Sequence, residues 1–346
     1  MLLRVRMGPW PYVAWGSLAV ASAVLGIGYI LGDKQLFVPG GWFGLDGRRV
    51  LEATTIWLAG GEPYAVRGFV YSPVALLLAA PWTLLPSVVA IIGWIATSVG
   101  LAVIGVIQSI RSRPWSNVML AVVGVVGFLP ALADLALANV TIALVVAITP
   151  IVRTNRIWAG LAFGVLSAAF PKPFVIPIVL WALVWRRQAA LGIIVGGVAA
   201  SVIAVLVVGL ATTGEFLSTL VSGGGISLQF LGNYGISLLS PPLALIVGAL
   251  SAAAFVIVLS RRGPVTGLAW AGAVGVLIAP YAGIYASLPM LVALPGLATI
   301  APGAAWIAAS IMILVAPWSP ISAGAVMAIA LIVPPAKDPR EQLHRP

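Results

Sequence analysis

Long apolar runs recur along the whole chain, and they constrain its fold more than any other feature. Runs close to the roughly 20 residues that an α-helix needs to cross a bilayer recur from residue 11 to residue 335. Of the 346 residues, 62% are hydrophobic and only 8% are charged, whereas a soluble domain carries about 25% charged residues. The sequence therefore predicts an all-α fold, a polytopic integral membrane helical bundle formed as one domain over residues 1–346.

Short basic clusters separate the apolar runs and indicate the topology, because membrane proteins keep Lys and Arg mostly in cytoplasmic loops. The clusters are Arg4/Arg6, Arg111/Arg113, Arg153/Arg156, Arg186/Arg187, Arg261/Arg262 and Lys337/Arg340/Arg345. With 11–31 as an uncleaved first helix and not a signal peptide, we expect about twelve spans, roughly ten to thirteen, in the cell membrane. The N- and C-termini are then cytoplasmic, 32–67 forms the first extracytoplasmic loop, and 336–346 forms a cytoplasmic tail.

Prolines and glycines add local detail to this topology. Pro73, Pro81 and Pro86 interrupt 71–86, which predicts a broken or re-entrant piece before a crossing helix at 88–110. The spaced glycines of the apolar runs are predicted to be helix-packing positions and not a phosphate-binding loop.

The first loop carries four of the eight acidic residues, which are Asp33, Asp46, Glu52 and Glu62. Its segment 47–59 mixes polar and apolar residues, and Gly60-Gly61 can end a short helix there. We expect an interfacial helix whose apolar face lies along the membrane surface. That face consists of Val50, Leu51, Ile56, Trp57 and Leu58.

The residue types that are missing exclude several kinds of chemistry. The chain has no cysteine, which excludes disulfides, thiol catalysis and thiolate metal sites. The single histidine, His344, lies in the tail, which excludes an imidazole metal site and a Ser-His-Asp triad in the membrane body. The first loop has no paired-acid cluster for a divalent ion, so we expect no metal and no cofactor. No basic stretch is interleaved with aromatic residues, so no nucleic-acid partner is expected.

Polar residues gather on one side of the predicted topology. Asp46 and Tyr71 lie on the outer side, and further polar residues fall at the outer ends of their spans. These are Asp134, Asn139, Lys172, Glu215, Asn233, Tyr281 and Tyr285. Because an ionisable residue at the edge of a span is costly and usually functional, their convergence predicts one extracytoplasmic site.

Five short motifs follow one another over roughly residues 10–300. The first is D-x(13)-GG-x-PY, formed by Asp46, Gly60, Gly61, Pro63 and Tyr64 and followed by YSP at 71–73. The others are LANVTIAL (137–144), FPKPF (170–174), GNYGISLL (232–239) and APYAGIY (279–285). In these motifs the chain resembles the GT-C glycosyltransferases. It is most similar to the bacterial polyprenyl-phosphate-mannose-dependent α-mannosyltransferases and their arabinofuranosyltransferase relatives.

The chain also departs from the pattern of that family. The family's Tyr-Pro-Pro is YSP at 71–73, its Gln and Asn are Asn139 and Thr141, and its late acidic position is Ile284. These departures affect the expected donor sugar and acceptor more than the class.

The resemblance implies a membrane glycosyltransferase that moves a sugar, mannose before others, from a polyprenyl-phosphate-linked donor to an extracytoplasmic glycolipid or polysaccharide acceptor. Asp46 would be the catalytic general base, with inversion at the sugar carbon. Cations would bind the donor phosphate, and the candidates are Arg48, Arg49, Arg67 and Lys172. Acceptor or sugar binding is expected of Tyr64, Tyr71, Asp134, Asn139, Asn233, Tyr281 and Tyr285.

Structural roles compete with these assignments in the first loop. Asp46 is a residue type that caps helix N-termini, so it could serve only as a cap. Arg48 and Arg49 could bind lipid headgroups at the interface.

Structural roles compete further along the chain as well. Asp134 could simply pair with a cation such as Lys172. Lys172, between two prolines, could extend to the interface, and Asn233 could cap a loop.

Two rival functions complete the alternatives. A transporter or flippase of a lipid-linked substrate would need polar residues at mid-membrane depth, of which the apolar runs hold almost none. A non-catalytic GT-C-like membrane subunit would keep the fold without the transfer reaction.

Overall fold

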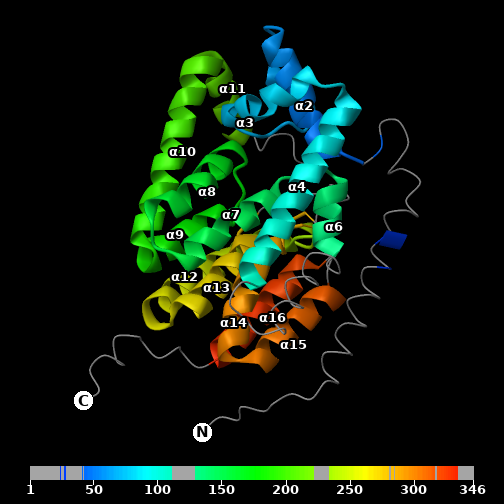
Figure 1. Ribbon diagram of the computed structural model, residues 1–346. Helices are drawn as coiled ribbons and strands as arrows, with labels where there is room; N and C mark the ends of the chain where they lie inside the picture. The colour runs from blue at the N-terminus through cyan, green and yellow to red at the C-terminus, as the bar shows by residue number, and fades with distance from the viewer. Residues whose placement is uncertain are drawn as a thin grey trace.

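The protein is helical throughout the part that the structure describes (Figure 1). The computed structural model describes residues 24, 27–28, 41, 43–110, 129–221, 234–279, 282–283, 285–315 and 318–333. The helices are α2 (Leu45–Leu58), η1 (Pro63–Ala65), α3 (Pro73–Ala79), η2 (Ala80–Leu84), α4 (Ser87–Ile110), α6 (Leu129–Ala136), α7 (Thr141–Arg153), α8 (Ile157–Ala169), α9 (Val175–Trp185), α10 (Arg187–Val208), α11 (Leu210–Val221), η4 (Ile236–Leu238), α12 (Pro241–Arg261), α13 (Pro264–Leu277), η5 (Leu288–Ala293), α14 (Leu294–Ile300), α15 (Pro302–Leu314) and α16 (Ser319–Ile332). The all-α prediction is confirmed for these residues.

Three of the described helices are long and apolar enough to cross a membrane. They are α4 over Ser87–Gly105, α10 and α12. The shorter apolar helical segments in the described ranges have 10–17 residues. This pattern is consistent with a helical membrane protein, and the number of about twelve spans stays a prediction.

The segment with three prolines is broken in the way that the sequence predicts. It folds as the short helices α3 and η2, and the long helix α4 starts only at Ser87. Pro73 stands in the first turn of α3, where its missing N–H has no helical partner to lose. Ser72 caps this turn, because its hydroxyl accepts a backbone N–H at 3.3 Å. The predicted break in 71–86 and the predicted helix at 88–110 are both confirmed.

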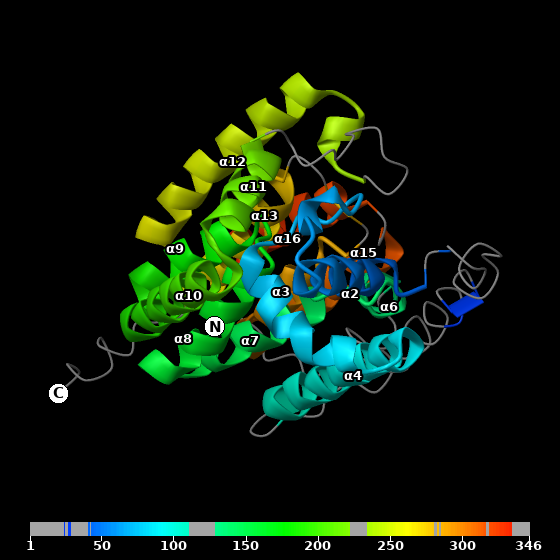
Figure 2. The same ribbon diagram turned by 90° about the horizontal axis from the view of Figure 1, so that it is seen from above.

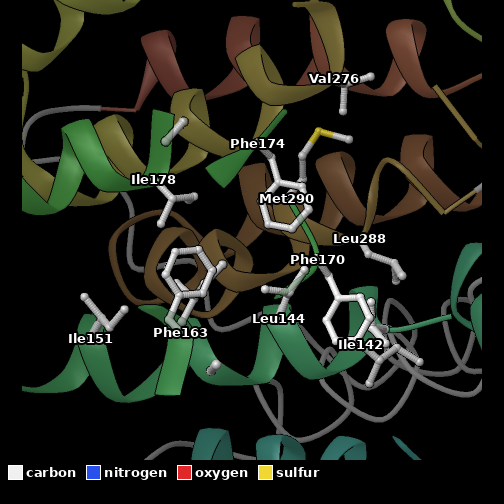
Figure 3. Packing of buried hydrophobic residues seen from close by; sticks show 14 of the residues in the cluster. Ile142, Leu144, Ile151, Phe163, Phe170, Phe174, Ile178, Val276, Leu288 and Met290 are labelled. Atoms are coloured by element: carbon white, nitrogen blue, oxygen red, sulfur yellow. The ribbon is translucent and has the colours of Figure 1, made fainter. Parts of the chain in front are cut away.

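The core of the bundle is centred on α13, which packs against α9, α12, α16 and η5. All residues of Thr266–Leu277 are buried. Glycines let neighbouring elements approach α13 closely, because a Cβ on Gly275 would meet Phe174 and one on Gly272 would meet the backbone of Met290. Figure 3 shows Phe174 and Met290 next to each other among the buried side chains.

Glycines also bring α8 and α10 into direct backbone contact. Gly160 and Gly164 of α8 face Gly192 and Gly196 of α10, four residues apart on each helix. A Cβ at any of these positions would overlap a backbone carbonyl of the facing helix. The prediction that spaced glycines are helix-packing positions is confirmed at this contact.

We expect Gly160→Ala to lower the free energy of unfolding by about 1–3 kcal/mol, because the new methyl group forces α8 and α10 apart. Gly197→Ala on α10 is the matched control. Its Cβ would lie 3.4 Å from the nearest atom, an ordinary contact, and Ala is the better helix former. Thermal unfolding of both variants in detergent micelles measures the difference. Equal melting temperatures would contradict the close glycine contact.

The helix of the first loop is present as α2, with the glycine turn that the sequence predicts at its end. Gly60 has φ +79°. The N–H groups of Gly60 and Gly61 donate to the carbonyls of Trp57 and Ile56, each at 2.9 Å. These two bonds satisfy the last carbonyl groups of the helix and end it.

The start of the apolar face of α2 packs on protein, so the prediction that this face lies along the membrane surface is wrong for Val50 and Leu51 and stays a prediction for Ile56, Trp57 and Leu58. Val50 and Leu51 are buried, and α2 packs against η1, α3, η2 and α4 (Figure 2). Leu58 is 55% exposed. The apolar pattern required burial of one face, and neighbouring helices provide it for the first half of α2.

Candidate functional site

Asp46, Asn139 and Lys172 form one connected group, although 126 positions separate the first residue from the last. Asn139 Nδ2 donates to Asp46 Oδ2 at 2.5 Å. Lys172 Nζ donates to Asn139 Oδ1 at 3.4 Å. Asp46 belongs to the first turn of α2, Asn139 to the α6–α7 connection, and Lys172 to the α8–α9 connection. The group is therefore built from the ends of several helices.

The backbone of α6 holds the N-terminus of α2 in place. Gly44 N donates to Ala136 O at 2.7 Å, and Asp46 N donates to Leu137 O at 3.0 Å. Unpaired N–H groups at the start of α2 thus meet unpaired carbonyls at the end of α6. Gly47 allows this approach, because a Cβ there would lie 2.9 Å from the Cβ of Ala138.

Asp46 does not cap α2, so the capping alternative is wrong. The N-cap is Gly44 with φ +66°, and no side chain accepts a cap hydrogen bond there. The Asp46 carboxylate is instead directed at the Asn139 amide. A buried face and two backbone bonds already stabilise this helix end, so the carboxylate is available for other contacts.

The Asn139 carbonyl oxygen is surrounded by donors. Besides Lys172, it accepts from Val140 N at 2.7 Å, Thr141 N at 3.3 Å and Thr141 Oγ1 at 3.0 Å. Asn139 is buried, and its oxygen satisfies the N–H groups of Val140, the N-cap of α7, and Thr141, the first residue of that helix. Thr141 occupies the motif position of the family's Asn, although it was not among the expected site residues.

Lys172 turns inward between its two prolines. Its Nζ lies 4.8 Å from the ring centroid of Tyr285 and 5.8 Å from that of Tyr71, in the geometry of cation–π contacts. Burial lowers the pKa of Lys172, while the carboxylates of Asp46 and Asp134 raise it. The Lys172 ammonium group thus contacts side chains of the bundle, and its position relative to a membrane interface stays a prediction.

Asp134 is fully buried and links α6 to α7. Its Oδ2 accepts from Ile142 N at 3.0 Å. Burial raises the pKa of Asp134 to about 6, while the Ile142 N–H, the Lys172 charge and the Thr141 hydroxyl act to lower it, and Asp46 acts to raise it. The structure records no ion pair between Asp134 and Lys172 in the described chain, so the link is electrostatic and not a direct contact.

The three arginines of the first loop have different surroundings. Arg49 Nη1 lies 3.8 Å from Asp46 Oδ1, one helical turn away. Arg48 Nη2 donates to the carbonyl of Gly41. Arg67 is exposed, and no hydrogen bond or ion pair joins it to Asp46 within the described residues. Of the three, only Arg49 stands beside the carboxylate.

Aromatic side chains connect the first loop to the bundle. Tyr64 OH donates to Tyr71 O at 2.9 Å, and the Tyr64 ring lies 5.2 Å from that of Phe69. The Tyr71 ring packs edge-on against Phe170 at 5.2 Å. Burial, followed by the charge of Glu215 on α11, raises the pKa of Tyr64. Its hydroxyl is used to hold the backbone of Tyr71, which makes Tyr64 a support of the site.

Two expected site residues, Asn233 and Tyr281, lie outside the described residues. Their neighbours do come together, because Tyr234 N donates to Ala282 O at 2.8 Å. Among the residues that were searched, no group of three or more His, Asp or Glu side chains could hold a metal ion.

A comparison with protein families supplies the identity. The model of glycosyltransferase family 87 matches residues 69–317, which is more than half of the chain. The chain belongs to glycosyltransferase family 87. No curated protein and no solved structure matches the chain. The family 87 match covers Asn139, Lys172 and Tyr285, and it begins after the helix that carries Asp46.

We expect Gly68→Ala to disturb the family 87 protein beyond the cost of its backbone. Gly68 has φ +80°, and its Cβ would lie 2.9 Å from Arg49 Cζ, so an alanine displaces the guanidinium from its place beside Asp46. Gly60→Ala is the matched control, with φ +79° and open space around the Cβ. Both changes carry the strain of roughly 1–2 kcal/mol for a left-handed residue. Sugar transfer should fall in Gly68→Ala only, and an equal effect of the two changes would show that Arg49 does not matter.

Proposed function

We propose that this family 87 protein transfers mannose from a polyprenyl-phosphate carrier to an extracytoplasmic glycolipid or polysaccharide, with inversion at the sugar carbon. The observation that carries the proposal is the group of Asp46, Asn139 and Lys172, in which a carboxylate and a cation meet without neutralising each other. Family membership supports sugar transfer as the reaction class. The choice of mannose, the lipid carrier and a GT-C-type fold rests on the motifs that resemble the mannosyltransferase family.

The reaction needs a base on one side of the sugar and a cation on the other. In the proposed step, the Asp46 carboxylate takes the proton of an acceptor hydroxyl as that oxygen bonds to the anomeric carbon. The bond between this carbon and the phosphate oxygen breaks, and its electron pair leaves with the carrier phosphate. Attack from the side opposite to the leaving group inverts the configuration.

Lys172 is the cation best placed to stabilise the leaving phosphate, and Arg49, which stands beside Asp46, is a further candidate for a phosphate contact. Lys172 lies between Tyr71 and Tyr285, and it retains donor capacity because an ammonium group has three N–H bonds. The Arg49 guanidinium stands 3.8 Å from the Asp46 carboxylate, and guanidinium groups suit bidentate phosphate contacts. Arg48 and Arg67 are candidates for outer contacts with the phosphate or with lipid headgroups.

The remaining candidates are proposed to bind the sugar or the acceptor. Tyr71 and Tyr285 flank the lysine, and aromatic faces and phenol groups both suit sugar rings. Asn233 and Tyr281 belong to the same proposal through their motifs. The protein is proposed to be multi-pass in the cell membrane with both termini cytoplasmic. The site would face outside, where the lipid tail of the donor enters from the bilayer.

We expect Asp46→Asn to reduce transfer by about 10²–10⁴-fold, the usual contribution of a general base. Glu52→Gln is the matched control, because Glu52 is an exposed acid on the same helix. The assay follows labelled sugar from polyprenyl-phosphate-mannose into a total membrane lipid extract. Full transfer by Asp46→Asn would remove this residue as the base. Absence of transfer by wild type from mannose and arabinofuranose donors would favour another donor or a non-catalytic subunit.

We expect Lys172→Met to reduce kcat/KM by about 10²–10³-fold, because the leaving phosphate loses a cationic donor in a half-buried place. Lys172→Arg keeps the charge and should retain more activity than Lys172→Met. Arg187→Met, an exposed basic position at the start of α10, is the control. A similar loss in Lys172→Met and Arg187→Met would contradict the assignment of the phosphate contact.

A further inference from the structure

One amide group separates the positive and negative charges of the site. Asn139 Nδ2 lies 2.5 Å from Asp46 Oδ2, and Asn139 Oδ1 lies 3.4 Å from Lys172 Nζ. The only ion pair of Asp46 in the described chain is the one with Arg49 at 3.8 Å. The carboxylate and the ammonium group are therefore bridged by a neutral side chain and do not pair directly.

The orientation of this amide is determined by its surroundings. Its oxygen accepts two backbone N–H groups, a hydroxyl and the lysine. A flipped amide would point its NH₂ group at these donors, which is unfavourable because an NH₂ group only donates. The nitrogen must then face Asp46, whose carboxylate accepts its hydrogen bond.

We propose that Asn139 is a positioning residue that holds the Asp46 carboxylate as a base and keeps it from pairing with Lys172. The inference rests on the proposed function, in which Asp46 accepts a proton and Lys172 binds phosphate. A direct contact between the two groups would weaken both roles, because it would occupy a carboxylate oxygen needed by the acceptor hydroxyl and ammonium N–H groups needed by the phosphate. Asn139 was expected to bind sugar or acceptor, and the contacts of its amide give it this different role.

Other charges around Asp46 act on the same carboxylate. Arg49 belongs to α2 itself, Lys172 approaches from the α8–α9 connection, and the buried Asp134 lies on α6. Two cations and one acid therefore surround Asp46, and a change of residue 139 leaves all three in place.

Asn139→Asp is the variant that tests the proposal. Aspartate has nearly the same shape and still accepts the N–H groups at the start of α7, since it is a good capping residue. In this variant the side chain of residue 139 presents a carboxylate oxygen to Asp46 in place of the N–H donor. Two facing carboxylates repel each other, so the pair keeps one shared proton up to a higher pH. We expect the acid limb of the pH profile of kcat to move to higher pH by about one unit or more.

Asn139→Ser is the matched control for the helix cap. Serine also caps helix starts, but its side chain is too short to join Asp46 to Lys172. We expect kcat to fall in this variant without a move of the acid limb to higher pH. A purely structural role of Asn139 predicts instead that both variants have a lower melting temperature and keep the wild-type pH profile.

The outcomes separate this inference from the function on which it rests. Loss of transfer in Asp46→Asn, together with a shift of the acid limb to higher pH in Asn139→Asp, supports both the base and the positioning role. Loss of transfer in Asp46→Asn with an unchanged profile in Asn139→Asp overturns the positioning role and leaves the base in place. If Asp46→Asn still transfers sugar, Asp46 is not the base, and the positioning role of Asn139 is overturned with it.

A second readout does not need activity. Aspartate labelled with ¹³C at its carboxyl carbon gives NMR signals for Asp33, Asp46, Asp134 and Asp338, and Asp46→Asn identifies the signal of residue 46. In Asn139→Asp this signal should complete its titration at a higher pH than in wild type. An unchanged titration overturns the positioning role even when no sugar donor is found.

Discussion

The site depends on the contact between the start of α2 and the end of α6. There the unpaired N–H groups of one helix meet the unpaired carbonyls of the other, with Gly44 N donating to Ala136 O at 2.7 Å. The partial charges at the two helix ends are opposite in sign, so the contact is favourable electrostatically as well. It fixes the first turn of α2 over the α6–α7 connection, and this brings the Asp46 carboxylate to the Asn139 amide.

The other half of the site depends on close packing within the bundle. Lys172 reaches the site because α8 and α9 end and begin beside the core helix α13, where Gly275 leaves room for Phe174. The glycine contact between α8 and α10 fixes the position of α8 by steric fit, since any side chain would overlap a carbonyl. The segment before α3 joins the same place, because Ser72 N donates to Ala169 O at 3.2 Å. Packing and hydrogen bonds together bring Lys172 into the same hydrogen-bonded group as Asp46.

This arrangement suits the proposed transfer of a sugar from a lipid phosphate. The Asn139 amide stands between Asp46 and Lys172 and is hydrogen-bonded to both, and the aromatic rings of Tyr71 and Tyr285 lie 5.8 and 4.8 Å from the ammonium group. We therefore assign different roles to Asp46, Asn139 and Lys172, although the three share one hydrogen-bonded group. Membership of glycosyltransferase family 87 agrees with such chemistry.

The sequence by itself determined the helical class, the break between α3 and α4, and the glycine turn after α2. Each of these follows from local properties, namely apolar length, proline geometry and positive φ. Only the tertiary structure decided that Val50 and Leu51 pack on protein, that Gly44 and not Asp46 caps α2, and that Arg49 stands beside the carboxylate while Arg67 is exposed. These outcomes depend on contacts between segments far apart in the chain. A local pattern shows that a face must be buried or that a charge needs a partner, but not which distant segment meets it.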